Sequence, residues 1–414
     1  MRNKEGNNMR ETRPNRYDDF ELLTDFGNLY EAHCKCRLGK RWKDSVAIYD
    51  IRALECTLYL QYLLKTGKYK ISRYHCFTIN ERGKQRDIKS TQYKDRVVQK
   101  CLTDQIIRPH IMPKLIYDNG ASVRGKGTDF ALDRLKAHLQ DYYRKYGSEG
   151  WILVGDFSKF FDSINHEYIN SLYAKEYKDE LIMAMIRHIH ASIPGGVGVP
   201  LGNELSQIDA LLVISDIDHG IKEQLHRKWY NRYNDDFYIL GRTKEELKCC
   251  LDWIEGRITQ RGLKLNTNKT KIVSLQAGIN FLGFHTYMTK SGKVVMRIKA
   301  KSKSRERQKL RKHKKKLLAG EMTMAAVREG YQSWKAHAER GNTYYVLQEM
   351  DCYFYGLFYD YITDEEKVRY EKLKISQSIR VAKRKARRNK QNGKSIKQLT
   401  GRREDQGHDN DIQR

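Results

Sequence analysis

Two short apolar segments that end in aspartates restrict the folds open to this chain more than any other feature. Trp151-Ile-Leu-Val-Gly-Asp156 is an apolar, β-prone run that ends on a carboxylate. The segment Tyr230–Leu240 places two adjacent carboxylates, Asp235 and Asp236, in a turn between two β-prone flanks. Neighbouring like charges raise each other's pKa unless a cation neutralises them, and oxygen ligands at this density suit Mg²⁺. Taken singly, an Asp-Asp turn is usually only a turn, and an aspartate that ends a strand is usually a cap.

The segments around these two predict an α+β domain. A strand, a helix, a hairpin, a helix and a further strand follow one another along the chain. A basic hairpin is expected over residues 75–90, with its turn at Arg82-Gly83. Residues 18–66 are expected to form two helices around the basic turn 37–43. Thr243-x-x-Glu246 is a capping box that opens a helix, and Gly262 marks where that helix stops.

The charge of the chain is concentrated in two segments. The formal net charge is +28; residues 297–316 hold twelve Lys or Arg and one acid, and residues 372–403 hold thirteen and no acid. Dense cationic runs bind phosphate backbones by releasing counterions, so nucleic acid is the expected partner. No apolar run approaches the ~18 residues that span a membrane, and no secretory signal is visible at the start, so a cytoplasmic protein without a membrane partner is expected.

A series of eight motifs resembles bacterial reverse transcriptases, and it covers roughly residues 18–360. Five palm-like motifs occur in order, and three upstream segments are similar to fingers motifs of bacterial members. The palm-like motifs are Asp156-Phe-Ser-Lys-Phe-Phe161-Asp162, Gly198-Val-Pro-Leu201-Gly202-Asn-Glu-Leu-Ser206-Gln207, Tyr233-Asn234-Asp235-Asp236, Leu263-Lys-Leu-Asn266-Thr-Asn-Lys269-Thr270 and Phe281-Leu-Gly283-Phe284. The fingers-like segments are Lys84-Gln-Arg86-Asp-Ile88, Asp95-Arg96-Val-Val-Gln99 and Ser122-Val-Arg124-Gly-Lys126-Gly127-Thr128.

The resemblance implies a right-hand polymerase with fingers, a palm built on an antiparallel sheet, and a helical thumb. The expected divisions are a helical N-terminal extension over 1–70, fingers over 71–150, a palm with interleaved fingers helices over 151–290, a helical thumb over 291–370 and a basic, disordered tail over 371–414. The implied activity is RNA-directed DNA synthesis by two Mg²⁺ ions about 4 Å apart, for which Mn²⁺ can substitute. The implied partners are a structured, non-coding template RNA, a DNA or RNA primer, and dNTPs.

The resemblance also implies roles for individual residues. The metal ligands would be Asp156, Asp235, Asp236 and the backbone of Phe157, with Lys269 protonating the pyrophosphate leaving group. The nucleotide would be bound by Lys84, Arg86, Arg96, Phe161, Leu201, Gly202, Ser206 and Gln207, where Phe161 blocks a ribose 2′-hydroxyl. The primer terminus would be gripped by Phe281, Leu282, Gly283 and Phe284. Nucleic acid would be bound by Arg124, Lys126, Lys299, Lys301, Lys303, Arg305 and Lys312. Simpler interpretations stay open, in which Phe161 is an ordinary core residue, Lys84 is a solvated hairpin lysine and Lys269 is a surface lysine.

Two departures from the common motif indicate a subtype. Most reverse transcriptases read Gln-Gly-x-x-x-Ser-Pro, whereas this chain has Leu201 in place of the Gln and Gln207 in place of the Pro. This pair resembles diversity-generating retroelement enzymes, which miscopy template adenines and act with a small basic accessory protein. Such enzymes are encoded by bacteria or phages. Loss of an amide at residue 201 would loosen selection there.

Other classes compete with this interpretation. Phage-defence or retron-like reverse transcriptases that use a non-coding RNA are the nearest alternative. An RNA-binding protein on an inactive polymerase fold is disfavoured by the intact aspartates. A metal-dependent nuclease would need a general-base histidine near the carboxylates, and His166 is more simply a histidine at the start of a helix.

Overall fold

The computed structural model describes the backbone of residues 19–81 and 84–404 and the side chains of residues 19–80 and 85–386. The chain divides into two compact units. The first runs to Leu282 and includes Tyr287–Val294, and the second comprises Gly283–Thr286 and the residues from Val295 onward. No helix in the described segments is both long enough and apolar enough to cross a bilayer.

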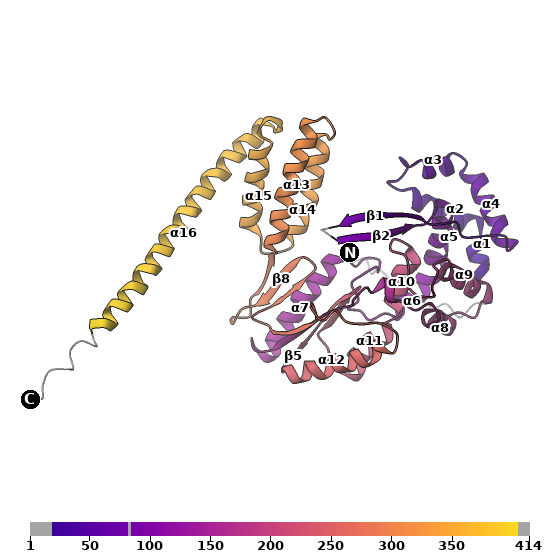
Figure 1. Ribbon diagram of the computed structural model, residues 1–414, viewed down its shortest axis with the longest axis horizontal. Coiled ribbons are helices and arrows are strands. Elements are labelled where there is room, and N and C mark those ends of the chain that lie inside the picture. The colour runs from indigo at the N-terminus through magenta and orange to yellow at the C-terminus, as the bar shows by residue number, and fades with distance from the viewer. Residues whose placement is uncertain (1–18, 82–83, 405–414) are drawn as a thin grey trace, which may run out of the picture. The chain divides into compact units, whose positions relative to one another are not determined.

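The first unit is an α+β domain (Figure 1). Its helices are α1 (Asp19–Thr24), α2 (Phe26–Arg37), α3 (Asp44–Ile51), α4 (Ala53–Lys65), α5 (Tyr93–Cys101), α6 (Arg108–Ile111), α7 (Thr128–Tyr146), α8 (His166–Glu176), α9 (Glu180–Ala191), α10 (Glu204–Leu212), α11 (Ser215–His219) and α12 (Lys244–Thr259). Shorter helical turns are η1 (Leu102–Ile107), η2 (Met112–Lys114), η3 (Phe161–Ser163) and η4 (Gly220–Gln224). Its strands are β1 (His75–Glu81), β2 (Lys84–Ser90), β3 (Trp151–Asp156), β4 (Tyr230–Tyr233), β5 (Asp236–Gly241), β6 (Lys271–Ser274) and β7 (Ile279–Phe281).

The palm sheet has the strand order β4-β5-β3-β6, and every neighbouring pair is antiparallel. Helix α12 packs on β3 and β5, and α7 packs on β4. The central strand β3 is apolar from Trp151 to Gly155, as suits a strand that is paired on both edges and covered by α12. A Cβ at Gly155 would lie 2.2 Å from the Phe237 ring, so this glycine leaves room for that ring to lie over β3. The expected α+β class with an antiparallel palm sheet is confirmed.

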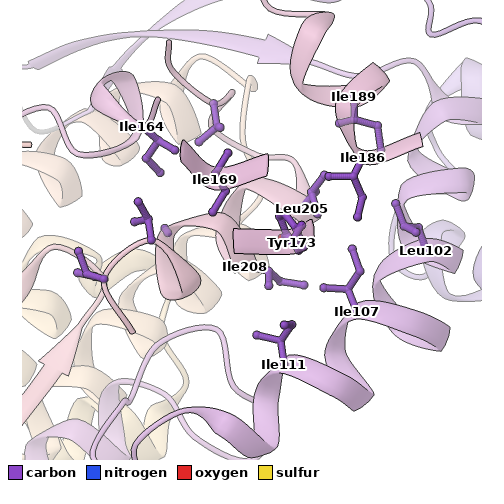
Figure 2. Close-up of a cluster of buried hydrophobic side chains, with 14 of the residues drawn as sticks. Leu102, Ile107, Ile111, Ile164, Ile169, Tyr173, Ile186, Ile189, Leu205 and Ile208 are labelled. Carbon is purple, nitrogen blue, oxygen red and sulfur yellow. The ribbon is translucent and has the colours of Figure 1, made fainter. Parts of the chain in front are cut away.

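A continuous apolar core supports this sheet from the helical side. Figure 2 shows part of it, where side chains of α8, α9 and α10 meet those of η1 and α6. The members that the figure labels include Leu102, Ile107, Ile111, Ile164, Ile169, Tyr173, Ile186, Ile189, Leu205 and Ile208. Because α10 is held in this core on one side, the residues at its start are fixed relative to the sheet.

The second unit contains the helical thumb. Strand β8 (Phe284–Met288) and strand β9 (Val294–Ile298) precede α13 (Ala300–Leu318), α14 (Met324–Glu339), α15 (Tyr344–Leu357), η5 (Tyr359–Tyr361) and α16 (Asp364–Glu404). Helices α13, α14 and α15 lie side by side (Figure 1), around a core that includes Leu310, Tyr331 and Phe354. The finer division into extension, fingers, palm and thumb at the expected boundaries stays a prediction.

Two local expectations were wrong. The sequence predicted two helices over 18–66, but four are present, because Asp25 caps α2 through the Asn28 N–H and Arg52 leaves helical geometry between α3 and α4. The sequence also predicted disorder from residue 371, whereas α16 continues to Glu404. This segment contains no proline, and three acids in its first turn favour the start of a helix. The turn Arg82-Gly83 lies outside the described residues.

Candidate active site

The two aspartate segments meet at one end of the palm sheet. Asp156 is the last residue of β3 and Asp236 the first of β5, and the two are directly opposite in the antiparallel register. The Phe157 N–H donates to the Asp235 carbonyl at 3.1 Å, which ties the turn to the end of β3. Asn234 has φ 52°, a left-handed conformation that asparagine tolerates better than most residues. The expected convergence of the three carboxylates is therefore present.

Burial and mutual repulsion define the electrostatics of this cluster. Burial raises the pKa of Asp235, and the nearby charge of Asp156 raises it further. Burial also raises the pKa of Asp236, together with the Asp235 charge and a hydrogen bond with Asp156. Three carboxyl groups held this close favour a shared cation, because a cation between them offsets the repulsion of their like charges.

Lys269 supplies a cation to the same cluster. Its Nζ donates to Asp156 Oδ1 at 2.5 Å. Burial lowers the pKa of Lys269, but the hydrogen bond and charge of Asp156 outweigh this, and the pKa is raised overall. The lysine is thus kept protonated beside the carboxylates, with about half of its side chain still exposed.

The donor set fits Mg²⁺, although it does not form a complete metal cage. Among the described residues, no three His, Cys, Asp or Glu side chains are arranged to enclose an ion by themselves. Mg²⁺ commonly uses one or two carboxylates and completes its shell with water and substrate phosphates, so an open, oxygen-only cluster suits it. The candidate ligands are Asp156, Asp235, Asp236 and the backbone of Phe157.

The candidate nucleotide-binding residues lie on several elements. Arg86, on the exposed part of β2, is near enough for its charge to favour ionised Asp235. Arg96 on α5 donates to Ser90 Oγ at 3.4 Å, so it supports the end of β2. Phe161 lies in η3, partly buried, with its ring 5.8 Å from that of Phe160. The Lys84 side chain is not among those that the structure describes.

The segment before α10 combines an exposed glycine with buried neighbours. Gly202 has φ 101°, and a Cβ there would meet open space, so the backbone is accessible at this point. Leu201 and Gln207 are partly exposed, whereas Ser206 is buried. His166 Nε2 lies 2.7 Å from the Gly198 carbonyl oxygen, so this histidine holds the segment and not the carboxylates.

The candidate primer grip is a tight turn between β7 and β8. Leu282 and Gly283 both have positive φ, at 42° and 93°. Phe281 and Phe284 are buried on either side of this turn, Phe281 against Tyr238 and Phe284 against His337. Only the backbone of the turn and the Leu282 side chain are thus available for contact with a primer.

The candidate nucleic-acid contacts differ in availability. Lys126 Nζ donates to the Tyr117 carbonyl at 2.6 Å, and Lys303 Nζ binds Glu349 at 3.1 Å, so both already support the protein. The other five side chains are exposed, although Lys299 and Arg305 among them also interact with the protein: Arg124, Lys299, Lys301, Arg305 and Lys312.

One further residue beside the turn escaped the sequence reasoning. Arg232, in β4, is fully buried and reaches the Asn234 carbonyl. Its only signal in the sequence is a charged residue within an otherwise β-prone run, which does not by itself distinguish a buried arginine from an exposed one.

Comparison with known proteins agrees with this geometry. Residues 73–286, just over half of the chain, match the family model described as reverse transcriptase (RNA-dependent DNA polymerase). The chain therefore belongs to the reverse transcriptase family. It is also similar to Protein YkfC of Escherichia coli (strain K12), with 23% identity over 212 residues, 41% of this chain and 54% of YkfC. The chain thus spans about half the length of that relative.

Solved telomerase structures are also similar. One is the apo telomerase from Candida tropicalis truncated from its C-terminal domain, with a TM-score of 0.43, 16% identity, and coverage of 59% of this chain and 60% of that chain. Another is the Candida albicans telomerase in complex with a TWJ fragment of telomeric RNA, with a TM-score of 0.44, 12% identity, and coverage of 78% and 68%.

Proposed function

We propose that this chain is an RNA-directed DNA polymerase that makes cDNA from a structured template RNA by two-metal nucleotidyl transfer. The observation that carries the proposal is the cluster of Asp156, Asp235, Asp236 and Lys269 at the end of the palm sheet. In this reaction the primer 3′-oxygen forms a bond to the α-phosphorus of a dNTP. The bond between that phosphorus and the α,β-bridging oxygen breaks, and pyrophosphate leaves.

The chain's own groups have separate parts in this step. The three carboxylates would hold two Mg²⁺ ions, which when bound activate the attacking hydroxyl and stabilise the leaving oxygen. Arg86, whose charge already acts on Asp235, would bind the triphosphate. Lys269 carries a proton within reach of the carboxylate cluster and would deliver it to the departing pyrophosphate.

Phe161 and the Leu201–Gly202 segment would select the nucleotide. A large ring at residue 161 would clash with a ribose 2′-hydroxyl, which favours dNTPs. The exposed backbone of Gly202 allows a base pair to approach without meeting a side chain.

We further propose the diversity-generating retroelement subtype. Its support is the pair Leu201 and Gln207, of which Leu201 is partly exposed beside Gly202. A template-repeat RNA and a small accessory protein would then be partners. A phage-defence or retron-like enzyme is the alternative within the family.

Primer extension on a pre-annealed RNA template and DNA primer, with and without Mg²⁺, tests the activity. We expect Asp235→Asn to abolish nucleotide addition and to leave RNA binding within about twofold of wild type, because the carboxylate serves the metal and not the phosphate backbone. Asp156→Asn should behave alike, and Asp236→Asn should be milder. Substantial extension by the Asp235 variant would contradict the site.

A further inference from the structure

A buried arginine connects the aspartate turn to the rest of the palm. The Arg232 side chain is fully buried, and all of its nitrogens donate. Nε and Nη2 bind the Asp218 carboxylate at distances of 2.6–3.0 Å. Nη1 donates to the Asn234 carbonyl at 3.2 Å and to Ala210 O at 3.4 Å, and Nη2 donates to Leu211 O at 3.1 Å. One guanidinium therefore binds three separate segments of the first unit.

Two of these segments, the turn and α10, bear on the candidate active site. Asn234 lies in the turn that carries Asp235 and Asp236. Ala210 and Leu211 belong to the last turn of α10, whose carbonyls lack partners within the helix. The start of α10 carries Ser206 and Gln207. The arginine thus links the turn that would bind metal to the helix that would contact the nucleotide.

The charges of this link are balanced within it. Burial lowers the pKa of Arg232, but the Asp218 charge and hydrogen bonds outweigh this, and the guanidinium stays protonated. Asp218, in α11, is also buried, and it accepts a further hydrogen bond from Tyr230 OH at 2.5 Å. Because the ion pair is internally neutral, its effect on the neighbouring carboxylates is mainly geometric.

The turn needs such support. Asn234 is held in a left-handed conformation that costs free energy, and such residues persist where surrounding contacts over-determine them. The Phe157 N–H fixes the turn at the Asp235 carbonyl, and Arg232 fixes it at the Asn234 carbonyl. A flat guanidinium with several donors can bind the turn, α10 and Asp218 at once, which the single ammonium of a lysine does less well.

We propose that Arg232 is a positioning residue that sets the spacing between the aspartate turn and α10. This inference rests on the proposed function, because only there does that spacing affect binding of metal and nucleotide. It assigns to Arg232 and Asp218 a part in the geometry of metal binding, beyond their contribution to folding.

The test is a paired substitution that leaves no unpaired buried charge. Arg232→Met/Asp218→Leu replaces the ion pair with apolar groups, an exchange that is often neutral for stability. Arg261→Met/Asp216→Leu is the control for loss of an ion pair at the end of α10, because Arg261 binds Asp216 and the Val213 carbonyl but makes no described contact with the turn. This pair is more exposed than Arg232 and Asp218, so it controls for the contact with α10 and not for burial. For each protein we would measure the melting temperature, kcat and KM for a dNTP, and Mn²⁺ binding by electron paramagnetic resonance.

We expect kcat of the Arg232/Asp218 variant to fall about 30- to 100-fold, because a misplacement of catalytic groups by about 1 Å can lower a rate about 100-fold. We expect the Mn²⁺ affinity to fall at least about fivefold, because the same shift moves the carboxylates. The double variant should still unfold cooperatively at a temperature above that of the assay, and the control should keep kcat within about threefold. Arg232→Lys keeps the positive charge beside Asp218 but loses the several donors of the guanidinium, so its kcat should fall about tenfold. If the double variant does not fold, this single variant tests the inference.

Two results would overturn the inference. One is a folded double variant, or an Arg232→Lys variant, with wild-type kcat and Mn²⁺ affinity. The other is an equal loss in the Arg261 control. If the wild-type chain extends no primer, the proposed function fails, while the Mn²⁺ measurement still decides whether Arg232 positions the carboxylates.

Discussion

Lys269 Nζ lies 2.5 Å from Asp156 Oδ1, although the two residues are separated by 113 positions in the chain. The loop that carries Lys269 is held to the end of β3, because the Asn266 N–H donates to the Asp156 carbonyl at 2.7 Å. The ammonium is therefore held at the carboxylates by the backbone as well as by charge. In the proposed reaction, this ammonium is the group that would protonate the departing pyrophosphate.

We expect Lys269→Met to lower kcat for nucleotide addition about 10²-fold, within the range of a lost general acid. The KM for the primer–template should change little, because the ammonium faces the carboxylates. Single-turnover extension measures both, with Lys271→Met, an exposed lysine on β6, as the control. A loss below about threefold would assign Lys269 to charge balance alone.

Phe161 gives a prediction on sugar selection. Phe161→Ala or Phe161→Val should raise the use of ribonucleotides relative to deoxynucleotides by at least about tenfold, because the ring would no longer meet a 2′-hydroxyl. Phe160→Leu is a control, since Phe160 is buried beside Phe161 and packs against Phe157. An unchanged ratio would make Phe161 a packing residue only.

Leu201 gives a prediction on fidelity that also tests the subtype. Leu201→Gln restores the common residue and should reduce misincorporation opposite template adenines, because an amide adds a directional contact beside the exposed Gly202 backbone. Sequencing cDNA from both proteins on one adenine-rich template measures the error spectra. Equal spectra would count against the diversity-generating interpretation.

Local patterns predicted the centre of the site well. The apolar run that ends at Asp156 and the Asp-Asp turn form adjacent antiparallel strands, and Thr243 caps α12 by accepting from the Glu246 N–H. The apolar run, the turn and the cap each span only a few residues, and a sequence displays such local patterns directly.

Features that depend on distant partners could not be predicted. Arg232 is buried only because Asp218 and the α10 carbonyls surround it, and none of these is marked by a local pattern. In the part of α16 up to residue 386, high charge suggested disorder, but Lys, Arg and Gln are good helix formers and the helix packs on α15 at its start. Net charge therefore did not predict the local conformation of this segment.

His138 predicts how stability depends on pH. Burial lowers its pKa to about 4 from 6.5, and its ring lies between Arg134 Nη2 at 2.9 Å and Tyr238 OH at 3.0 Å. The folded chain therefore keeps His138 neutral where the unfolded chain binds a proton. The free energy of unfolding is unaffected by this group above its unfolded pKa. As the pH falls from 6.5 toward 4, it should drop by about 1.4 kcal/mol per pH unit.

His138→Gln removes this titration and can still accept from Arg134. Urea denaturation of both proteins between pH 7 and pH 4.5 should show about 2–3 kcal/mol less acid loss in the variant, since the other groups titrate alike in both. Parallel curves for the two proteins would show that His138 is not held neutral.

The two cationic segments should contribute differently to nucleic-acid binding. Helix α13 carries the exposed cations Lys301, Arg305 and Lys312, and it belongs to the thumb core through Leu310. Helix α16 continues well beyond its contacts with α15 and is exposed over residues 381–386.

Each phosphate contact steepens the log–log salt dependence of binding by about 0.7–0.9. Gln377 and Arg380 still contact α15, so the truncation should begin after them. Deleting residues 381–414 should therefore flatten that slope by several contacts and weaken binding at moderate salt, while turnover on a short pre-annealed duplex stays nearly unchanged. Reversing the charge of Lys301, Arg305 and Lys312 should instead impair extension of any primer. Paired salt titrations and extension assays measure both effects. If the truncated chain alone fails to extend a primer on the short duplex, the roles assigned to α13 and α16 must be exchanged.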